Sequence, residues 1–178
     1  MDLSALNKIS YGLYIVCSKS GEKLNGQIAN TVFQVTAEPA KIAVCINKQN
    51  LTHQFISESN MFSVSILAQD APLTFIGKFG FKSGRDTGKF EGTGYRVQLA
   101  ASGVEPGTGC PVILDHSVGF IEARVVSQCD VGTHTLFVGE VVDSGIFNDK
   151  ELMTYDYYHK FLKGKTPKTA TTYSAEKD

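Results

Sequence analysis

The chain has 178 residues, of which 42% are hydrophobic and 20% charged, proportions typical of one globular domain with a substantial core. Seventeen Lys and Arg residues against eighteen Asp and Glu residues give a formal net charge of -1, so no basic surplus favours a nucleic-acid partner. No apolar run approaches the roughly 20 residues that span a membrane, and residues 1–10 lack the apolar centre of a secretion signal. We therefore expect a cytoplasmic protein that binds neither nucleic acid nor membranes.

The cysteines are far apart in the sequence and form no Cys-x-x-Cys pair. None is spaced from a histidine as in a four-ligand zinc site, so we expect no metal centre. In a reducing compartment, free and mostly buried thiols are expected at Cys17, Cys45, Cys110 and Cys129.

Short runs rich in β-branched and aromatic residues, bounded by glycine and polar clusters, predict a series of β-strands. In chain order they cover Tyr14 to Ser18, Gly26 to Ala37, Lys41 to Asn47, Met61 to Leu67, Val118 to Gln128 and Thr135 to Ile146. The last two runs are separated by a polar turn and predict a long antiparallel hairpin.

Helices are expected to be fewer and shorter than strands. They are predicted around Leu3, Leu6 and Ile9, from Thr52 to Ser59, from Pro72 to Gly80 and from Met153 to Lys163. Thr52 is a candidate N-cap, Pro72 suits the opening of a helix, and Gly80 suits its end.

The balance of elements predicts a mainly β fold, an antiparallel barrel or sandwich with short helices. Strands and helices do not alternate regularly, which argues against a doubly wound parallel sheet. We expect one domain over residues 1–162. Residues 163–178 are polar and rich in Pro, Thr and Lys, and are predicted to form a mobile tail.

Three polar segments interrupt the strand pattern and are candidate site segments. Residues 25–31 begin Asn-Gly and allow close backbone approach, although a half-buried strand with one polar face has the same pattern. Residues 47–52 join a strand to a helix, where backbone amides can hold an anion, as at any capped helix start. Residues 80–90 are glycine-rich, with two lysines and an arginine, which suits either one phosphate or a solvated loop.

Two other motifs are rejected. Gly88-Lys89 resembles part of a P-loop, but Ser83 stands where that motif needs glycine and Phe90 where it needs Ser or Thr. The run 115–117 (Asp-His-Ser) has the residue types of a hydrolase triad, but adjacent side chains diverge and cannot relay a proton. No Gly-x-Gly-x-x-Gly follows a strand, so a Rossmann site is not expected.

Five fragments occur in order along nearly the whole chain: residues 11–16, 25–35, 62–67, 79–90 and 132–141. The last has the pattern Gly-x-His-x-x-x-x-Gly-x-Val, from Gly132 to Val141. Together they resemble the flavin reductase-like FMN-binding split-barrel family. The resemblance implies an antiparallel Greek-key split barrel, FMN as the cofactor and a homodimer.

The C-terminal region adds a narrower resemblance. Residues 157–159 (Tyr-Tyr-His) followed by residues 164–170 resemble the join between the flavin and rubredoxin domains of high-molecular-weight rubredoxins. The cysteine pairs of a rubredoxin are absent from this sequence. The chain is therefore similar to a free-standing flavin domain and to flavoredoxins, which implies rubredoxin as a candidate redox partner.

The resemblance also implies roles for individual residues. The polar edge of the isoalloxazine ring would be held by Ala29, Asn30, Thr31 and Val32. The ribityl chain and phosphate would be held by Asn47, Lys48, Asn50, Leu51 and Thr52. The phosphate side would be closed by Phe79, Gly80, Ser83, Gly84, Arg85 and Lys89.

Two further roles are implied near the ring. His134 would be the catalytic residue beside its open face, and Tyr158 would help wall the site from the partner subunit. Thr133 stands where an aspartate is frequent in the family, which leaves the orientation of the histidine open.

The resemblance implies a flavin reductase, in which NADH or NADPH passes hydride to flavin N5 and electrons leave to free flavin, ferric iron or a redox protein. The alternative is a flavoredoxin-like electron carrier without NAD(P)H activity. A pyridoxamine-phosphate-oxidase-like or haem-binding split barrel is a third interpretation. The sequence identifies neither the preferred nicotinamide nor the acceptor.

Overall fold

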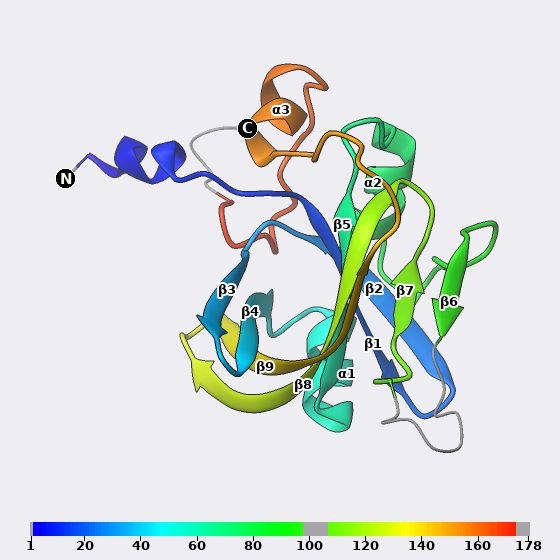
Figure 1. The fold of residues 1–178 in the computed structure, drawn as a ribbon. Coiled ribbons are helices and arrows are strands. Elements are labelled where there is room, and N and C mark those ends of the chain that lie inside the picture. The colour runs from blue at the N-terminus through cyan, green and yellow to red at the C-terminus, as the bar shows by residue number, and fades with distance from the viewer. Residues whose placement is uncertain (1, 98–106, 174–178) are drawn as a thin grey trace.

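The computed structural model describes residues 2–97 and 107–173 (Figure 1). Seven antiparallel strands form one sheet in the order β2-β1-β5-β8-β9-β4-β3. Their bounds are β1 Tyr14–Ser20, β2 Lys23–Ala29, β3 Val32–Ala37, β4 Ala40–Asn47, β5 Met61–Leu67, β8 Ser117–Asp130 and β9 His134–Ile146. A small second sheet pairs β6 (Tyr95–Val97) with β7 (Pro111–Ile113).

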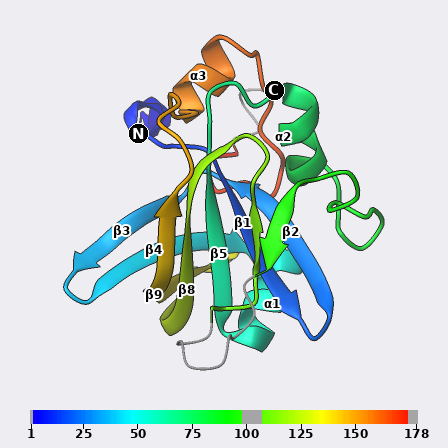
Figure 2. The same ribbon diagram turned by 45° about the vertical axis from the view of Figure 1, so that its right-hand side comes forward.

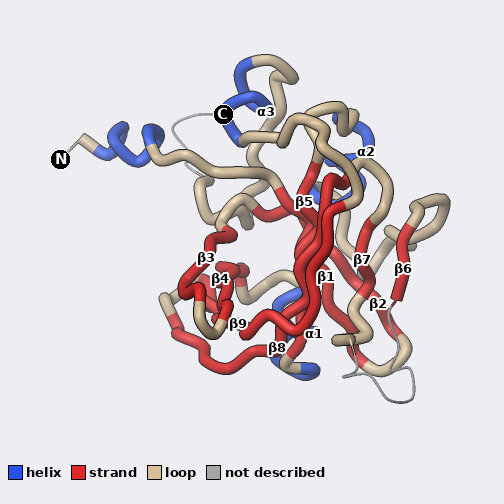
Figure 3. The backbone as a smooth tube through the Cα atoms, viewed as in Figure 1, coloured by secondary structure: helices blue, strands red, loops and turns tan. Residues whose placement is uncertain are grey.

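The large sheet curls so that its two edge strands are also neighbours in the chain. β2 and β3 lie at opposite edges of the sheet, yet only Asn30 and Thr31 separate them. Register shifts in β3, β5 and the β8–β9 pair mark bulges or irregularities, which bend strands and increase their twist. Figure 3 shows the strands curving around a common interior. The short link therefore joins the two edges and closes the barrel.

Both faces of β1 are buried along most of its length. Val16 packs in a cluster inside the barrel with β4 and with Ile56. Ile15 and Cys17 point the other way, as the period of two requires, into a cluster with Phe79 and other apolar side chains. In this outer cluster, apolar residues of α2 and of the loops pack against the outer face of β1.

The helices lie at the ends of the barrel. The 3₁₀ helix η1 covers Leu3–Lys8, and the α-helices are α1 Leu51–Ser59, α2 Leu73–Gly80 and α3 Tyr155–Lys160. Figure 2 shows α1 at one end of the sheet, with α2 and α3 at the other. No helix in the described part of the chain is long and apolar enough to cross a membrane.

The structure confirms the mainly antiparallel β fold and corrects several bounds. The predicted single strand over 26–37 is wrong: the chain leaves one sheet edge after Ala29 and enters the other at Val32. The N-cap of α1 is Asn50 and not Thr52, which lies inside the helix. The C-terminal helix is shorter than expected, and the predictions omit β6 and β7.

The cysteines and the C-terminal segment can also be compared with their predictions. The four cysteines are free, with Cys17 and Cys110 buried, Cys45 half-buried and Cys129 exposed. Residues 163–173, expected to be mobile, make hydrogen bonds to the domain, one of them between Asn30 and Thr172. Residues 174–178 of the expected tail lie outside the described residues.

Candidate functional site

One face of β2 is polar and largely buried. Asn25, Gln27 and Ala29 share this face because side chains alternate along a strand. The Asn25 amide Nδ2 donates to the Thr52 hydroxyl at 2.8 Å. Asn25 Oδ1 and Gln27 Oε1 are buried and have no hydrogen-bond partner among the described residues. Since an unpaired buried acceptor costs about 1–3 kcal/mol, this face is a candidate contact for a ligand that donates hydrogen bonds.

The start of α1 lies beside this polar face. Asn47 Oδ1 accepts from the Gln49 amide at 2.9 Å, and Asn47 O accepts from the Asn50 amide at 3.0 Å. These bonds shape the turn that leads to Leu51, and Asn50 makes no side-chain cap. The first amides of a helix lack intrahelical partners, so the amides of Leu51 and Thr52 form an anion-binding end.

The glycine-rich loop that follows α2 closes over the same place. A Cβ on Gly84 would lie 2.0 Å from Asn25 Oδ1 and 3.3 Å from Leu51 Cδ2, so only a residue without a side chain fits there. Arg85 NH1 donates to Gln49 O at 3.3 Å. The predicted Leu51, Thr52 and Gly84 therefore meet around Asn25, and Arg85 lies beside Gln49, just before α1.

Ser83 shapes this loop from within. Its carbonyl accepts from the amides of Asp86 and Thr87 at 3.2 and 3.1 Å, and its hydroxyl accepts from the Arg85 amide at 3.2 Å. These bonds fold residues 83–87 into a turn that holds Arg85 at its position beside Gln49.

Lys89 holds the loop from the inside. Its ammonium donates to Gly26 O at 2.8 Å and to Phe79 O at 3.2 Å, and the residue is 5% exposed. Burial lowers the pKa of Lys89 to about 8, against an opposing effect of the Cys17 thiol. The amine joins β2 to the end of α2, which suits a supporting role better than direct phosphate contact.

The predicted ring-edge residues lie at the other end of β2. Ala29 is four positions from Asn25, about 13 Å along a strand, and is followed by the link to β3. Val32 N donates to Asn30 O at 3.2 Å, so this amide is used by the turn itself. Thr31 O accepts from Cys45 N at 3.1 Å. The amides of Asn30 and Thr31 are the candidate ligand donors.

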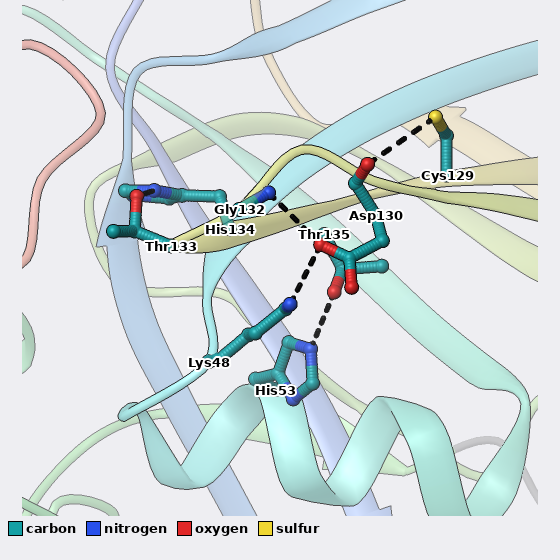
Figure 4. Close-up of polar contacts among 8 residues, drawn as sticks. All are labelled: Lys48, His53, Cys129, Asp130, Gly132, Thr133, His134 and Thr135. Atoms are coloured by element: carbon teal, nitrogen blue, oxygen red, sulfur yellow. Dashed lines mark hydrogen bonds and ion pairs between the residues drawn. The ribbon is translucent and has the colours of Figure 1, made fainter.

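His134 lies at the start of β9, opposite Asn47 in the β4–β9 register. Its Nδ1 is 2.9 Å from the Thr133 hydroxyl, and its Nε2 is buried without a partner among the described residues (Figure 4). Thr133 therefore takes part in orienting the ring. On β4, the Cys45 amide donates to Thr31 O, and Asn47 pairs with His134. Thr31 and His134 therefore contact positions of β4 that are two residues apart.

Lys48 is paired away from the phosphate end of the site. Its ammonium lies 2.6 Å from Asp130 in the β8–β9 hairpin (Figure 4). Nearby, His53 Nε2 is 2.8 Å from the Thr135 hydroxyl. Burial lowers the pKa of His53, helped by the charges of Lys48 and His134. This cluster holds the first turn of α1 against the hairpin.

Three predicted residues support the site from the core. Phe79 is 1% exposed and packs its ring in the outer cluster, and Gly80 packs on Ile28. Tyr158 is 4% exposed in that cluster, and its hydroxyl donates to Lys165 O at 2.9 Å. None of their side chains reaches Asn25, Thr52 or His134 through a hydrogen bond in the described part of the chain.

The prediction omitted Asn25 and Gln27 as site residues, although both lie in a segment it selected. Their alternation with Gly26 and Ile28 was the available signal, since it places two amides on one strand face. What the sequence did not show is that α1 would cover this face and bury it.

These features fit a flavin mononucleotide. The start of α1 and Arg85 suit its phosphate, the unpaired oxygens of Asn25 and Gln27 suit ribityl hydroxyls, and the link after Ala29 suits the polar ring edge. His134 Nε2, buried without a hydrogen-bond partner among the described residues, is a further polar atom available to a ligand.

Comparison with known proteins gives the family. The model of the flavin reductase-like domain matches residues 6–163. A ferric-chelate reductase (NAD(P)H) from Archaeoglobus fulgidus is 51% identical over 177 residues, which cover 99% of this chain and 100% of that protein. A high molecular weight rubredoxin from Moorella thermoacetica is 47% identical, over 100% of this chain and 75% of its own length.

Structural comparison agrees with this assignment at the level of the fold. The crystal structure of flavoredoxin from Methanosarcina acetivorans superposes with a TM-score of 0.66 at 21% identity, covering 78% of this chain and 70% of that one. The resemblance drawn from the five sequence fragments is confirmed. The chain belongs to the flavin reductase-like family of flavin-binding oxidoreductases.

Proposed function

We propose that this chain binds FMN along the polar face of β2 and is an NAD(P)H-dependent reductase that passes electrons to a separate acceptor. The observation that carries the proposal is the pair of buried, unpaired amide oxygens on Asn25 and Gln27, beside the open start of α1. Most buried polar atoms in native proteins are hydrogen-bonded, so two unpaired acceptors on one strand face support a bound ligand as their partner.

The hydrogen-bond directions at Thr52 support this placement. Because Thr52 Oγ1 accepts from Asn25 Nδ2, its own hydrogen is free to donate to a ligand oxygen. Arg85 uses one guanidinium nitrogen on Gln49 O and keeps others for a phosphate. Both donors lie at the same end of β2, where the helix dipole also favours negative charge.

FMN is proposed instead of FAD because the site offers one anion-binding end. FMN carries a single terminal phosphate monoester, which suits the amides of Leu51 and Thr52 with one arginine. Competition between FMN and FAD for the apoprotein tests this choice directly.

The bound flavin would accept hydride from the nicotinamide and release electrons to the acceptor. The chain would contribute the backbone amides of Asn30 and Thr31 at the polar ring edge, where negative charge grows on reduction. His134, oriented by Thr133, would present Nε2 on the nicotinamide side.

Ferric complexes are the proposed acceptors, supported by the 51% identity to the ferric-chelate reductase. A second candidate function is an electron carrier without NAD(P)H activity. The Moorella relative, which is named a rubredoxin, supports that role and makes rubredoxin the partner to test.

We also propose a homodimer in the cytoplasm. β3 is an edge strand whose outer side chains Phe33 and Val35 are about half exposed, and Val126 and Val131 are similarly exposed at the far end of the β8–β9 hairpin. Such apolar strand surface suits burial against a second copy. Free cysteines suit a reducing compartment. Light scattering and cell fractionation test the two parts.

The decisive experiment is flavin loading followed by stopped-flow mixing of the holoprotein with NADH or NADPH. We expect a yellow protein with one FMN per chain, bleached by at least one nicotinamide and reoxidised by ferric citrate. A chain that binds FMN but is not bleached would be the carrier, and a chain that refuses FMN would overturn the proposal.

A further inference from the structure

The C-terminal segment, residues 163–173, returns to the ring-edge end of the site after α3 (Figure 1, orange to red). Gly164 N donates to Tyr158 O at 3.0 Å, and the Tyr158 hydroxyl donates to Lys165 O at 2.9 Å. These bonds hold the beginning of the segment on α3. Its far end is held at a different place.

Tyr155 joins two points of this segment. Its hydroxyl lies 2.8 Å from the hydroxyl of Thr166 and 2.8 Å from that of Thr172. Tyr155 itself is fixed, because its amide donates to Tyr11 O at 2.8 Å and its ring packs edge-on against Tyr11. The segment between the two threonines is thus tied to one rigid phenol.

The chain of hydroxyls ends on the β2–β3 link. Asn30 Nδ2 donates to Thr172 Oγ1 at 2.9 Å, and Asn30 Oδ1 accepts from the Thr31 hydroxyl at 3.2 Å. Asn30 is 5% exposed. Without the Thr172 hydroxyl, a nearly buried amide N–H would lose its partner, and the link would be free to adopt other side-chain and backbone angles.

We propose that Tyr155 and Thr172 are positioning residues for the flavin site, which hold the Asn30–Thr31 link in the geometry that receives the ring edge. This inference rests on the proposed function, since the Asn30–Thr31 link has a ring edge to bind only if the chain binds a flavin. The C-terminal segment then belongs to the site, although it is distant from Asn30 in sequence.

The test uses the full chain with three substitutions in the segment and one in α3. Thr172→Val and Tyr155→Phe each remove a hydroxyl, Thr172→Ser keeps it, and Thr171→Val alters the exposed neighbour of Thr172. We expect the first two to weaken FMN binding about three- to tenfold, the range of one hydrogen bond. Thr172→Ser and Thr171→Val should bind as the wild type does.

Two further readouts separate positioning from general stability. The midpoint potential of bound FMN should shift in Thr172→Val and Tyr155→Phe and return in Thr172→Ser. In the apoprotein, hydrogen exchange of the residue 30–32 amides should quicken in the same two variants. The variant that combines Thr172→Val with Tyr155→Phe should bind FMN no more weakly than the weaker single variant. Both substitutions interrupt the same chain of hydrogen bonds.

Other outcomes of these measurements would contradict the inference or the proposed function. Unchanged affinity, potential and exchange in Thr172→Val would overturn the inference, and so would an equal effect of Thr171→Val. Tighter FMN binding by Thr172→Val would show that the segment competes with the flavin. If the wild type binds no FMN, the proposed function fails, while exchange in the apoprotein still reports whether the segment holds the link.

Discussion

The hydroxyl of Thr133 lies 2.9 Å from Nδ1 of His134, and Nε2 of the same ring is buried without a hydrogen-bond partner among the described residues (Figure 4). A hydroxyl can donate to or accept from an imidazole nitrogen, so this contact does not impose one tautomer as a carboxylate would. The neutral contact supports orientation of the ring without adding negative charge beside it.

His134→Ala should slow flavin reduction by NAD(P)H about tenfold, equivalent to about 1.4 kcal/mol, while FMN affinity changes less than about twofold. In the proposed function the imidazole faces the nicotinamide, and no hydrogen bond in the described part of the chain joins it to Thr52 or Arg85. Single-turnover bleaching and fluorescence titration measure the two quantities. Thr133→Val, which keeps the imidazole, should show a smaller loss of rate. A collapse of FMN affinity would instead identify His134 as a cofactor ligand.

Thr52→Val should weaken FMN binding by about 1–2 kcal/mol, because it removes a ligand donor and leaves Asn25 Nδ2 without its acceptor. Isothermal titration of the apoprotein with FMN measures this. The matched control is Thr74→Val, an exposed helical threonine on α2. Equal affinities for the Thr52 variant and the wild type would show that the start of α1 does not contact the flavin.

Gly84→Ala should displace the loop, because the new Cβ would lie 2.0 Å from Asn25 Oδ1. We expect FMN affinity to fall about tenfold or more, as Arg85 moves with the loop and a charge-assisted hydrogen bond is lost. Gly77→Ala is the control, since no atom lies within 4 Å of its Cβ position, and in a helix it should stabilise by up to about 1 kcal/mol. Thermal unfolding checks that both variants fold. Wild-type affinity of the Gly84 variant would place the phosphate elsewhere.

Four places show how far the sequence predicts the structure of this protein. The runs at Met61–Leu67 and Lys41–Asn47 predict their strands well because apolar period and β-branched content act locally. The run at Gly26–Ala37 misleads, since nothing local shows that its halves join opposite sheet edges at Asn30. At Lys89 the charge suggests a phosphate contact, and the structure shows the amine donating to Gly26 O.

The site shows the same limit. The family fragments select segments that the structure brings together around Asn25, but contacts between distant residues decide which side chains can reach a ligand. Asn25 joins the candidate site only because α1 covers β2, and Thr172 reaches Asn30 only because the chain returns past α3. Residues so far apart in sequence leave no periodic signal.

The buried amine of Lys89 should make stability depend on pH. Burial lowers its pKa from 10.5 to about 8 in the folded chain. Between these values the unfolded chain binds more protons than the folded one, so this group makes stability rise as pH increases through that window. Below the folded pKa both states are charged, and the buried charge costs stability in full.

Lys89→Met tests this by removing the charge while keeping the length of the side chain. The free energy of unfolding of the wild type relative to this variant should rise from about pH 7.5 to about pH 10. Loss of the bonds to Gly26 O and Phe79 O adds an offset that is the same at each pH. Cys17 adds little to the difference, since burial raises its pKa and keeps the thiol neutral in the folded chain. Lys82→Met, an exposed lysine in the same loop, should give a flat difference. A flat difference for Lys89→Met as well would mean that water reaches the amine and that the loop is not held from inside.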